Sequence, residues 1–253
     1  MIRLIRIEFL RLWSRRLTRV GILLAIALSA VAGVIAAATS KQPSPLSLVE
    51  VADVLPGVSP FYMIGALVVG ASFLGADWSA GTIATQLTWE PRRLRVLVAK
   101  VIALAIGVFV LAVVLEAVLV AFLAAAAAIN GVTDGVDGTW LSDIGETLIR
   151  AGAVCSIGAL IAMSIAMVSR TTAAALGIAF AWLAVAEGLI RGLKPSLQPW
   201  LIGENIAIFL IGFNDGVIPG SGRTATTAGL QLLLYAAIGV VIAGAWFSRR
   251  DVT

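Results

Sequence analysis

Residues 75–100 read GADWSAGTIATQLTWEPRRLRVLVAK and form the main polar interruption on the arginine-rich side of an otherwise apolar chain. This stretch begins with an acid at the end of one apolar run and finishes with a lysine at the start of the next. We interpret it as a short helix on the membrane surface between two membrane-spanning helices. The rest of the chain then supplies the membrane body that this helix would move.

The composition excludes an ordinary soluble domain. Hydrophobic residues make up 60% of the 253 residues and charged residues 13%, against about 45–50% and about 25% in a typical globular domain. Several charge-free runs are close to the roughly 20 residues that cross a bilayer. The sequence therefore predicts an all-α membrane protein with one transmembrane domain over residues 1–253.

Six apolar runs are predicted to cross the membrane as helices. They cover approximately residues 20–38, 54–76, 101–129, 148–168, 173–193 and 225–247. Proline-containing residues 39–57 and acidic residues 130–146 are predicted to be loops between them.

An amphipathic helix in the headgroup layer is predicted ahead of the first span, over residues 1–19. Helical spacing places Phe9 and Leu12 on one face and Glu8, Arg11 and Arg15 on the other. A cleaved signal peptide is disfavoured, because its apolar core would be about 7–15 residues and the run that follows here is longer.

The insert before the last span, residues 194–224, is rich in proline and glycine. It encloses a short apolar piece, residues 201–213, of about 20 Å as a helix, which is too short to cross. We predict a re-entrant or surface helix on the outer side of the membrane.

The distribution of basic residues predicts the topology. With the N-terminus in the cytoplasm, 13 of the 18 lysines and arginines lie on the inner side, as the positive-inside rule requires. Lys41, Arg150, Arg191, Lys194 and Arg223 are the outer ones. We therefore expect a multi-pass protein of the plasma (inner) membrane with both termini in the cytoplasm.

The polar stretch, residues 75–100, contains signals for a turn followed by a short helix. Gly81-Thr82 permits a sharp turn, and Thr82 is expected to cap the short helix over residues 83–88. Proline disfavours a helix at the residue before it, so Pro91 ends this helix. Lys100 is expected to snorkel at the foot of the third span. A basic cytoplasmic loop without a special role is the simplest alternative interpretation.

The order of these features resembles the coupling segment of the type-2 ABC exporter permease family. The common features are an acid, Gly-Thr, a short helix, Pro-Arg-Arg and a lysine at the next span. The similarity extends to the basic interfacial helix, the short turn between the fourth and fifth spans, the insert before the last span and the ending at residues 247–251. Asp77 departs from the pattern, since family members more often have glutamate there.

The resemblance implies that residues 77–95 contain a coupling helix, which docks on a separate ATP-binding subunit. It implies coupling roles for Asp77, Gly81, Thr82, Ile83, Thr88, Pro91, Arg92, Arg93 and Lys100.

No catalytic residue is predicted in this chain. A P-loop needs a lysine directly after a glycine, and Lys41, Lys100 and Lys194 all lack one. MgATP would therefore sit on the partner, and this chain would bind no cofactor of its own. There is no histidine to act as a base or metal ligand, and Cys155 is expected to be a packing residue.

We expect two copies of the ATP-binding subunit, a second permease copy that completes a homodimer, contact with lipid, and no nucleic acid.

Four charged residues are predicted to lie within or at the ends of spans: Glu116, Arg150, Glu187 and Arg191. One interpretation is ion pairing, of Glu187 with Arg191 or Arg150. The other is a polar gate along the outer exit of a substrate path, because ionisable groups are expensive to keep inside a membrane.

The leading hypothesis is the permease subunit of an ATP-driven exporter that moves a lipophilic substrate such as a drug, lipid or peptide outward. A stand-alone secondary transporter or channel is the alternative, although it would need ion-coupling groups at mid-depth. A membrane enzyme is the third and weakest hypothesis, since no nucleophile-and-base arrangement is evident.

Overall fold

A computed structural model describes residues 1–40, 45–211 and 223–249. Within these ranges the chain is helical apart from short loops and one isolated bridge between Ser47 and Val132. Predictions that concern Lys41, residues 212–222, Arg250 and Asp251 lie outside the described residues.

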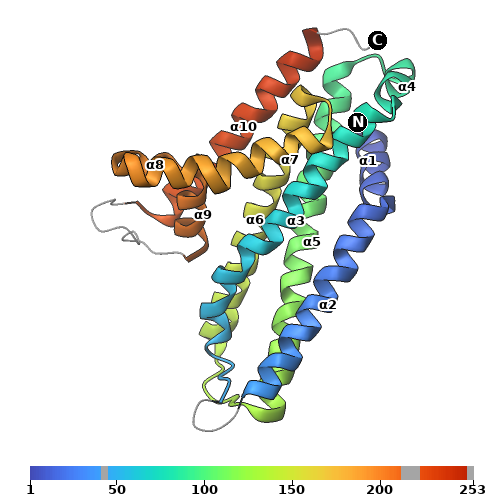
Figure 1. Ribbon diagram of the computed structural model, residues 1–253. Helices are drawn as coiled ribbons and strands as arrows, with labels where there is room; N and C mark the ends of the chain where they lie inside the picture. Colours follow the sequence, from blue (N-terminus) through green and yellow to red (C-terminus); the bar gives the residue numbers. More distant parts are fainter. Residues whose placement is uncertain (41–44, 212–222, 250–253) are drawn as a thin grey trace.

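The helices follow one another with few breaks (Figure 1). Their bounds are α1 Ile2–Ser14, α2 Arg16–Thr39, α3 Val51–Ser79, α4 Thr82–Trp89, α5 Arg93–Asn130, α6 Gly138–Ser169, α7 Thr172–Phe180, η1 Ala181–Ala186, α8 Glu187–Leu193, η2 Pro195–Trp200, α9 Ile202–Ile211 and α10 Ala225–Arg249. The η1 segment is a π-helical turn that continues α7 directly into α8, and η2 is a 3₁₀ helix.

Six helices in the described part of the chain are long and apolar enough to cross a membrane. They are α2, α3, α5, α6, the continuous α7–η1–α8 and α10. This confirms the prediction of a multi-pass, all-helical membrane protein. The N-terminus and the end of α10 lie toward the same end of the bundle as α4, while residues 45–50 and 131–137 lie at the opposite end (Figure 1).

The centre of the bundle is α6, whose apolar segment is 72% buried. Its closest neighbour is α3, and the two backbones approach tightly at Gly70. A Cβ atom on that residue would lie 2.1 Å from the carbonyl oxygen of Ala159. Small residues allow this kind of close helix packing in membranes.

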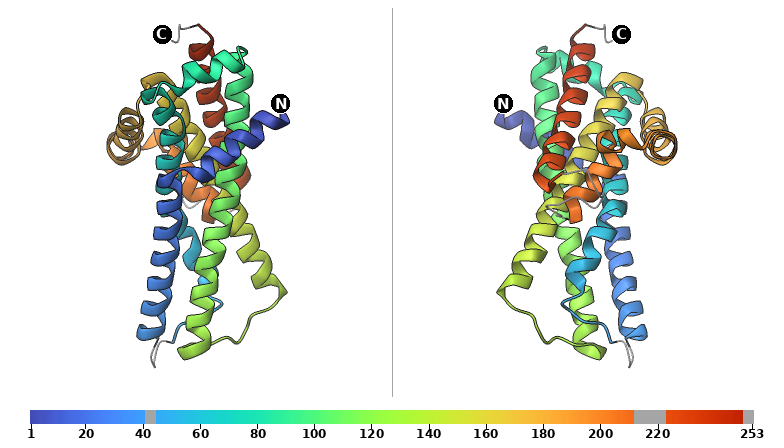
Figure 2. Two further views of the ribbon diagram at one scale, coloured as in Figure 1. Left: turned by 90° about the vertical axis from the view of Figure 1, so that its right-hand side faces the viewer. Right: turned by 90° about the vertical axis from the view of Figure 1, so that its left-hand side faces the viewer.

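The fifth predicted span is continuous from Thr172 to Leu193 but does not run parallel to its neighbours. Figures 1 and 2 show it crossing the bundle and projecting from its side. Only 17% of its apolar segment is buried. Arg170, in the left-handed conformation with φ 60°, makes the sharp turn that sets this direction. Hydropathy predicts the length of such a helix but not its direction.

Two predicted loops proved too long. The second span begins at Val51, so Pro56 and Pro60 lie inside α3. The fourth begins at Gly138, where the Asp137 side chain accepts a hydrogen bond from the Trp140 amide and caps α6. Polar residues at the ends of long helices therefore resembled loop residues in the sequence.

The close contact at Gly70 predicts a large effect of a small substitution. Gly70→Ala should force α3 and α6 apart and destabilise the protein by about 1–3 kcal/mol, the usual cost of overpacking. Gly65→Ala is the matched control, because a Cβ atom there meets nothing within 4 Å. Thermal unfolding in detergent should show a lower midpoint for the first variant and an unchanged or higher one for the second. Equal midpoints would contradict this account of the packing.

Candidate functional site

The short helix α4 occupies the polar stretch between the second and third spans. Gly81 precedes it with φ 67°, and it ends at Trp89, just before the extended Glu90 and Pro91. The Thr82 hydroxyl donates to the carbonyl oxygen of Asp77, 3.1 Å away, so it does not cap α4 as predicted. It closes the end of α3 instead.

One side of α4 packs on the protein and the other is exposed. Ile83 is 3% exposed and is the only fully buried residue of the helix. Trp89, at the other end, is 87% exposed. Thr85, Thr88, Trp89 and Arg92 are exposed together, and we call these four residues the docking face.

A group of three buried charged residues and one half-buried arginine lies next to α4. We call Glu8, Arg15, Asp77 and Lys100 the charge cluster. Glu8 comes from α1, Arg15 from the junction between α1 and α2, Asp77 from α3, and Lys100 from α5. Lys100 is 2% exposed and Glu8 is fully buried. The cluster thus joins helices that are distant in sequence at a single point.

Hydrogen bonds satisfy every carboxylate oxygen of the charge cluster. The Lys100 Nζ atom donates to Glu8 Oε2 at 2.8 Å and to Asp77 Oδ2 at 2.7 Å. Arg15 donates to Asp77 Oδ1 at 2.6 Å. Gln86 of α4 donates to Glu8 Oε1 at 2.6 Å. Arg11, which is more exposed, also pairs with Glu8 Oε1 at 3.3 Å. Each acid is therefore paired with at least one base, and its burial is tolerated because its charge and hydrogen bonds are compensated.

An aromatic ring and backbone carbonyls complete the surroundings of the cluster. Lys100 Nζ and Arg15 Cζ lie 5.1 and 5.2 Å from the centre of the Phe73 ring, within the range of cation–π attraction. Arg15 also donates to the carbonyl oxygens of Ser72 and Phe73. The guanidinium of Arg15 therefore holds the start of α2 against α3.

Two predictions fail at this cluster. Lys100 does not snorkel, because its ammonium group is directed to Glu8 and Asp77 inside the protein. Glu8 does not lie on a solvent-facing side of α1. It is buried together with Leu12, four residues later, and Arg15 follows at the next turn. Glu8 therefore shares the packed side of α1 with the apolar Leu12, whereas Arg11 of the predicted polar face is exposed.

The ends of α3 and α5 that flank α4 are also joined to the last helix. The Trp78 and Phe247 rings meet edge to face, with centroids 6.3 Å apart. Arg93 donates to the Phe247 carbonyl oxygen, and Arg170 lies over the Trp78 ring at 4.8 Å. The helices before and after α4 are therefore both in contact with α10.

The four charged residues predicted to form ion pairs or a gate do not form a single group in the structure. Glu187 pairs with neither arginine: it accepts hydrogen bonds from Trp182 Nε1 and from the backbone amides of Ile202 and Gly203, at 2.7–3.1 Å. These amides begin α9, so Glu187 fastens α9 to α8.

Both arginines have other acidic partners. Arg191 pairs with Glu204 at 3.1 Å, and Arg150 pairs with Glu146 one turn away. The predicted pairing of Glu187 with Arg191 or Arg150 is therefore wrong in the described structure.

Glu116 lies apart from the other three, on α5. Its carboxyl group is buried, and neither oxygen has a hydrogen-bond partner in the described part of the chain, with Ser59 as a polar neighbour. It therefore shares no site with Glu187.

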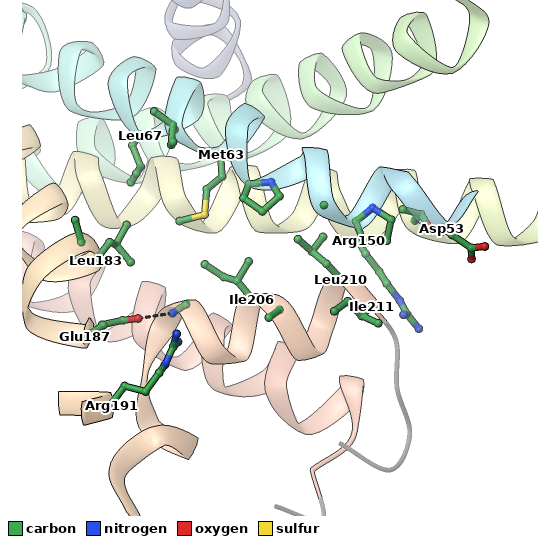
Figure 3. A pocket seen from close by; sticks show the side chains of 18 of the residues that line it. Asp53, Met63, Leu67, Arg150, Leu183, Glu187, Arg191, Ile206, Leu210 and Ile211 are labelled. Atoms are coloured by element: carbon green, nitrogen blue, oxygen red, sulfur yellow. Dashed lines mark hydrogen bonds between the residues drawn. The ribbon is translucent and has the colours of Figure 1, made fainter. Parts of the chain in front are cut away.

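A cavity of about 1240 Å³ lies between the first half of α3, α6, α8 and α9. Figure 3 shows apolar side chains, among them Met63 and Ile206, lining the space, with Arg150 toward one end and Glu187 and Arg191 along the opposite wall. Three of the four predicted gate residues therefore line one cavity, and Glu116 does not.

Sequence reasoning missed several residues at these sites: Glu8, Arg15, Gln86 and Trp89. One signal was present, because Glu8 is the single acid among the arginines of the first helix. An isolated acid in a basic segment, together with an isolated lysine in an apolar run, favours a buried pair. Nothing in the sequence indicated that Gln86 would complete the pair.

Removal of the buried lysine should be costly. Lys100→Met removes the buried ammonium group between Glu8 and Asp77 and leaves each carboxylate without one of its donors, so the free energy of unfolding should fall by about 3–5 kcal/mol. Arg95→Met is the control, because its pair with Glu90 is partly exposed and should be worth no more than about 1 kcal/mol. Unfolding in mixed detergent micelles measures both.

A second variant checks the cause of this loss. Adding Glu8→Gln to Lys100→Met removes the fully buried carboxylate that lost its ammonium donor and leaves the Arg15–Asp77 pair, so most of the lost stability should return. Full stability of the single Lys100→Met variant, or no recovery in the double variant, would contradict the electrostatic account.

Comparison with known proteins gives one family. No curated protein matches the chain. A family model described as "Protein of unknown function (DUF2705)" matches residues 22–253, which is most of the sequence and includes α4 and the cavity. The chain belongs to this DUF2705 family.

Proposed function

We propose that this chain is the membrane-spanning permease subunit of an ATP-driven exporter of the type-2 ABC class. The observation that carries the proposal is the connection of an exposed short helix to a buried charge cluster. The docking face of α4 is available to a partner, while Gln86 joins the same helix to Glu8 and so to Lys100 and Asp77.

The connection gives α4 a mechanical role. A partner that pushes on the docking face would displace Ile83 and Gln86, which contact the body of the protein. Rigid packing and hydrogen bonds would pass this displacement to α1, α3 and α5 together, because packed interiors do not deform continuously. Coordinated tilting of these helices would open and close the membrane body to its two sides.

The docking face suits a protein partner. Trp89 is a large, almost fully exposed aromatic residue, and the exposed Arg92 follows it three positions later in the sequence. Tryptophan and arginine are enriched among residues that dominate binding energy at protein interfaces. In this proposal the partner is a P-loop ATPase, present in two copies, which binds MgATP and hydrolyses it. A second copy of the permease completes the membrane body, and the complex lies in the plasma membrane with α4 in the cytoplasm.

A secondary transporter remains the second candidate because of Glu116. A buried carboxyl group without a hydrogen-bond donor in the described structure is typical of an ion-coupling site within a membrane. The two functions differ in their energy source. Transport by proteoliposomes that contain this chain alone, driven by an ion gradient and abolished by Glu116→Gln, would favour the second candidate.

The exporter proposal predicts a stable complex with an ATPase. Affinity-tagged chain, extracted from its native membranes in mild detergent, should retain a P-loop subunit that mass spectrometry identifies and should show vanadate-sensitive ATP hydrolysis. The chain purified from a foreign host without that subunit should hydrolyse no ATP. Trp89→Ala combined with Arg92→Glu should lower the retained ATPase at least tenfold, the effect of roughly 1.4 kcal/mol or more.

Leu141→Ala is the control for that variant. Leu141 is a similarly exposed apolar residue near the opposite end of the bundle, so its loss should leave the complex intact. Unchanged thermal stability of both variants would exclude misfolding as the cause. Retention of the full amount of ATPase by the Trp89→Ala, Arg92→Glu variant would remove α4 as the docking element.

A further inference from the structure

The cavity between α3, α6, α8 and α9 is large enough for a cargo molecule. Its volume of about 1240 Å³ exceeds the roughly 300–1,000 Å³ of typical small-molecule sites. Apolar side chains from α3, from the α7–η1 part of the fifth span and from α9 line one part of it: Met63, Leu67, Phe180, Leu183, Ile206 and Leu210. This part can accommodate an apolar body of substantial size.

Acidic residues outnumber basic residues in the cavity lining. The described lining contains four carboxylates and two arginines. Arg150 and Arg191 are already paired, with Glu146 and Glu204, and so offer little net positive charge to a ligand. The charge of Glu187 is stabilised by two amides and the Trp182 indole.

Two carboxylates of the lining have no partner within the described protein. In the described structure the side chains of Asp53 and Asp143 form no hydrogen bond or ion pair, and both residues are exposed, so they line the open, solvated part of the cavity. Asp53 is on α3 and Asp143 is on α6, so the excess negative charge comes from two walls.

The backbone of α3 adds hydrogen-bond acceptors on the same side. Pro56 and Pro60 lie inside the helix and have no N–H group. The carbonyl groups of Ala52 and Pro56, one turn earlier in each case, therefore lack their usual helical donors. Both residues line the cavity. Free acceptors beside uncompensated carboxylates favour a ligand that is positively charged or rich in N–H donors.

We infer that this cavity binds a cationic amphiphile, with its apolar body against Met63, Phe180 and Leu183 and its positive group near Asp53 and Asp143. The inference deepens the proposed function, because it specifies the class of cargo that the exporter would carry. An anionic amphiphile of the same size would meet excess negative charge and no unpaired arginine.

Tetraphenylphosphonium and tetraphenylborate test the inference directly, because they have nearly the same shape and opposite charge. Each is equilibrated with the full chain in nanodiscs of zwitterionic lipid, and binding to empty nanodiscs is subtracted. The cation should bind saturably and the anion should not. Asp53→Asn combined with Asp143→Asn should weaken cation binding about tenfold, as expected for the loss of two nearby charges at a partly solvated site.

Two further variants locate the effect in the cavity. Asp134→Asn removes an exposed acid from the loop before α6, outside the cavity lining, and should leave binding unchanged. Phe180→Ala should weaken cation binding several-fold through the lost apolar contact. Asp53→Lys combined with Asp143→Lys should reverse the preference toward tetraphenylborate. Equal binding of both ions, or an equal loss with Asp134→Asn, would overturn the inference.

The binding experiment uses no ATPase, so its outcome is independent of partner docking. Failure of cation binding, in a chain that retains its ATPase, would refute the cargo class and leave the exporter. Cation binding by a chain that never acquires an ATPase would keep the cavity assignment and remove the exporter.

Discussion

One buried lysine between two carboxylates holds this protein together at the end where α4 lies. Lys100 donates to Glu8 and Asp77, Arg15 donates to Asp77, and Gln86 and Arg11 donate to Glu8. A buried charge is stable at such a position only while its partners stay in place. Removal of one partner leaves the opposite charge buried and unpaired, which is strongly destabilising. The positions of α1, α3, α4 and α5 are thereby made dependent on one another.

The cavity and the charge cluster involve opposite ends of α3. The first half of α3 contributes Asp53, Pro56 and Met63 to the cavity, while its last turn contributes Asp77 to the charge cluster. Tight packing against α6 at Gly70 lies between the two. If α3 moves as a rigid rod, a change at the cluster alters the cavity. In the proposed function, this arrangement would let a partner at α4 act on a cargo bound in the cavity.

Much of the fold could be predicted from the sequence because hydropathy and helix breakers are local signals. The six apolar helices and the short helix that ends before Pro91 depend on length, composition and the residues next to them. Other features depend on tertiary contacts. The direction of α7–α8 follows from a turn at Arg170, and the burial of Lys100 follows from a partner 92 residues away. Helical periodicity also placed Glu8 on a polar face of α1, because it cannot distinguish solvent from a buried ion pair.

The central claim is that the charge cluster transmits movement of α4 to the membrane body. The most direct measurement is the ratio of cargo transported to ATP hydrolysed by the reconstituted complex that carries Glu8→Gln with Lys100→Met. This pair of substitutions removes the connection without leaving a buried unpaired charge. We predict that ATP hydrolysis persists while transport falls at least tenfold. An unchanged ratio of transport to hydrolysis would contradict the claim.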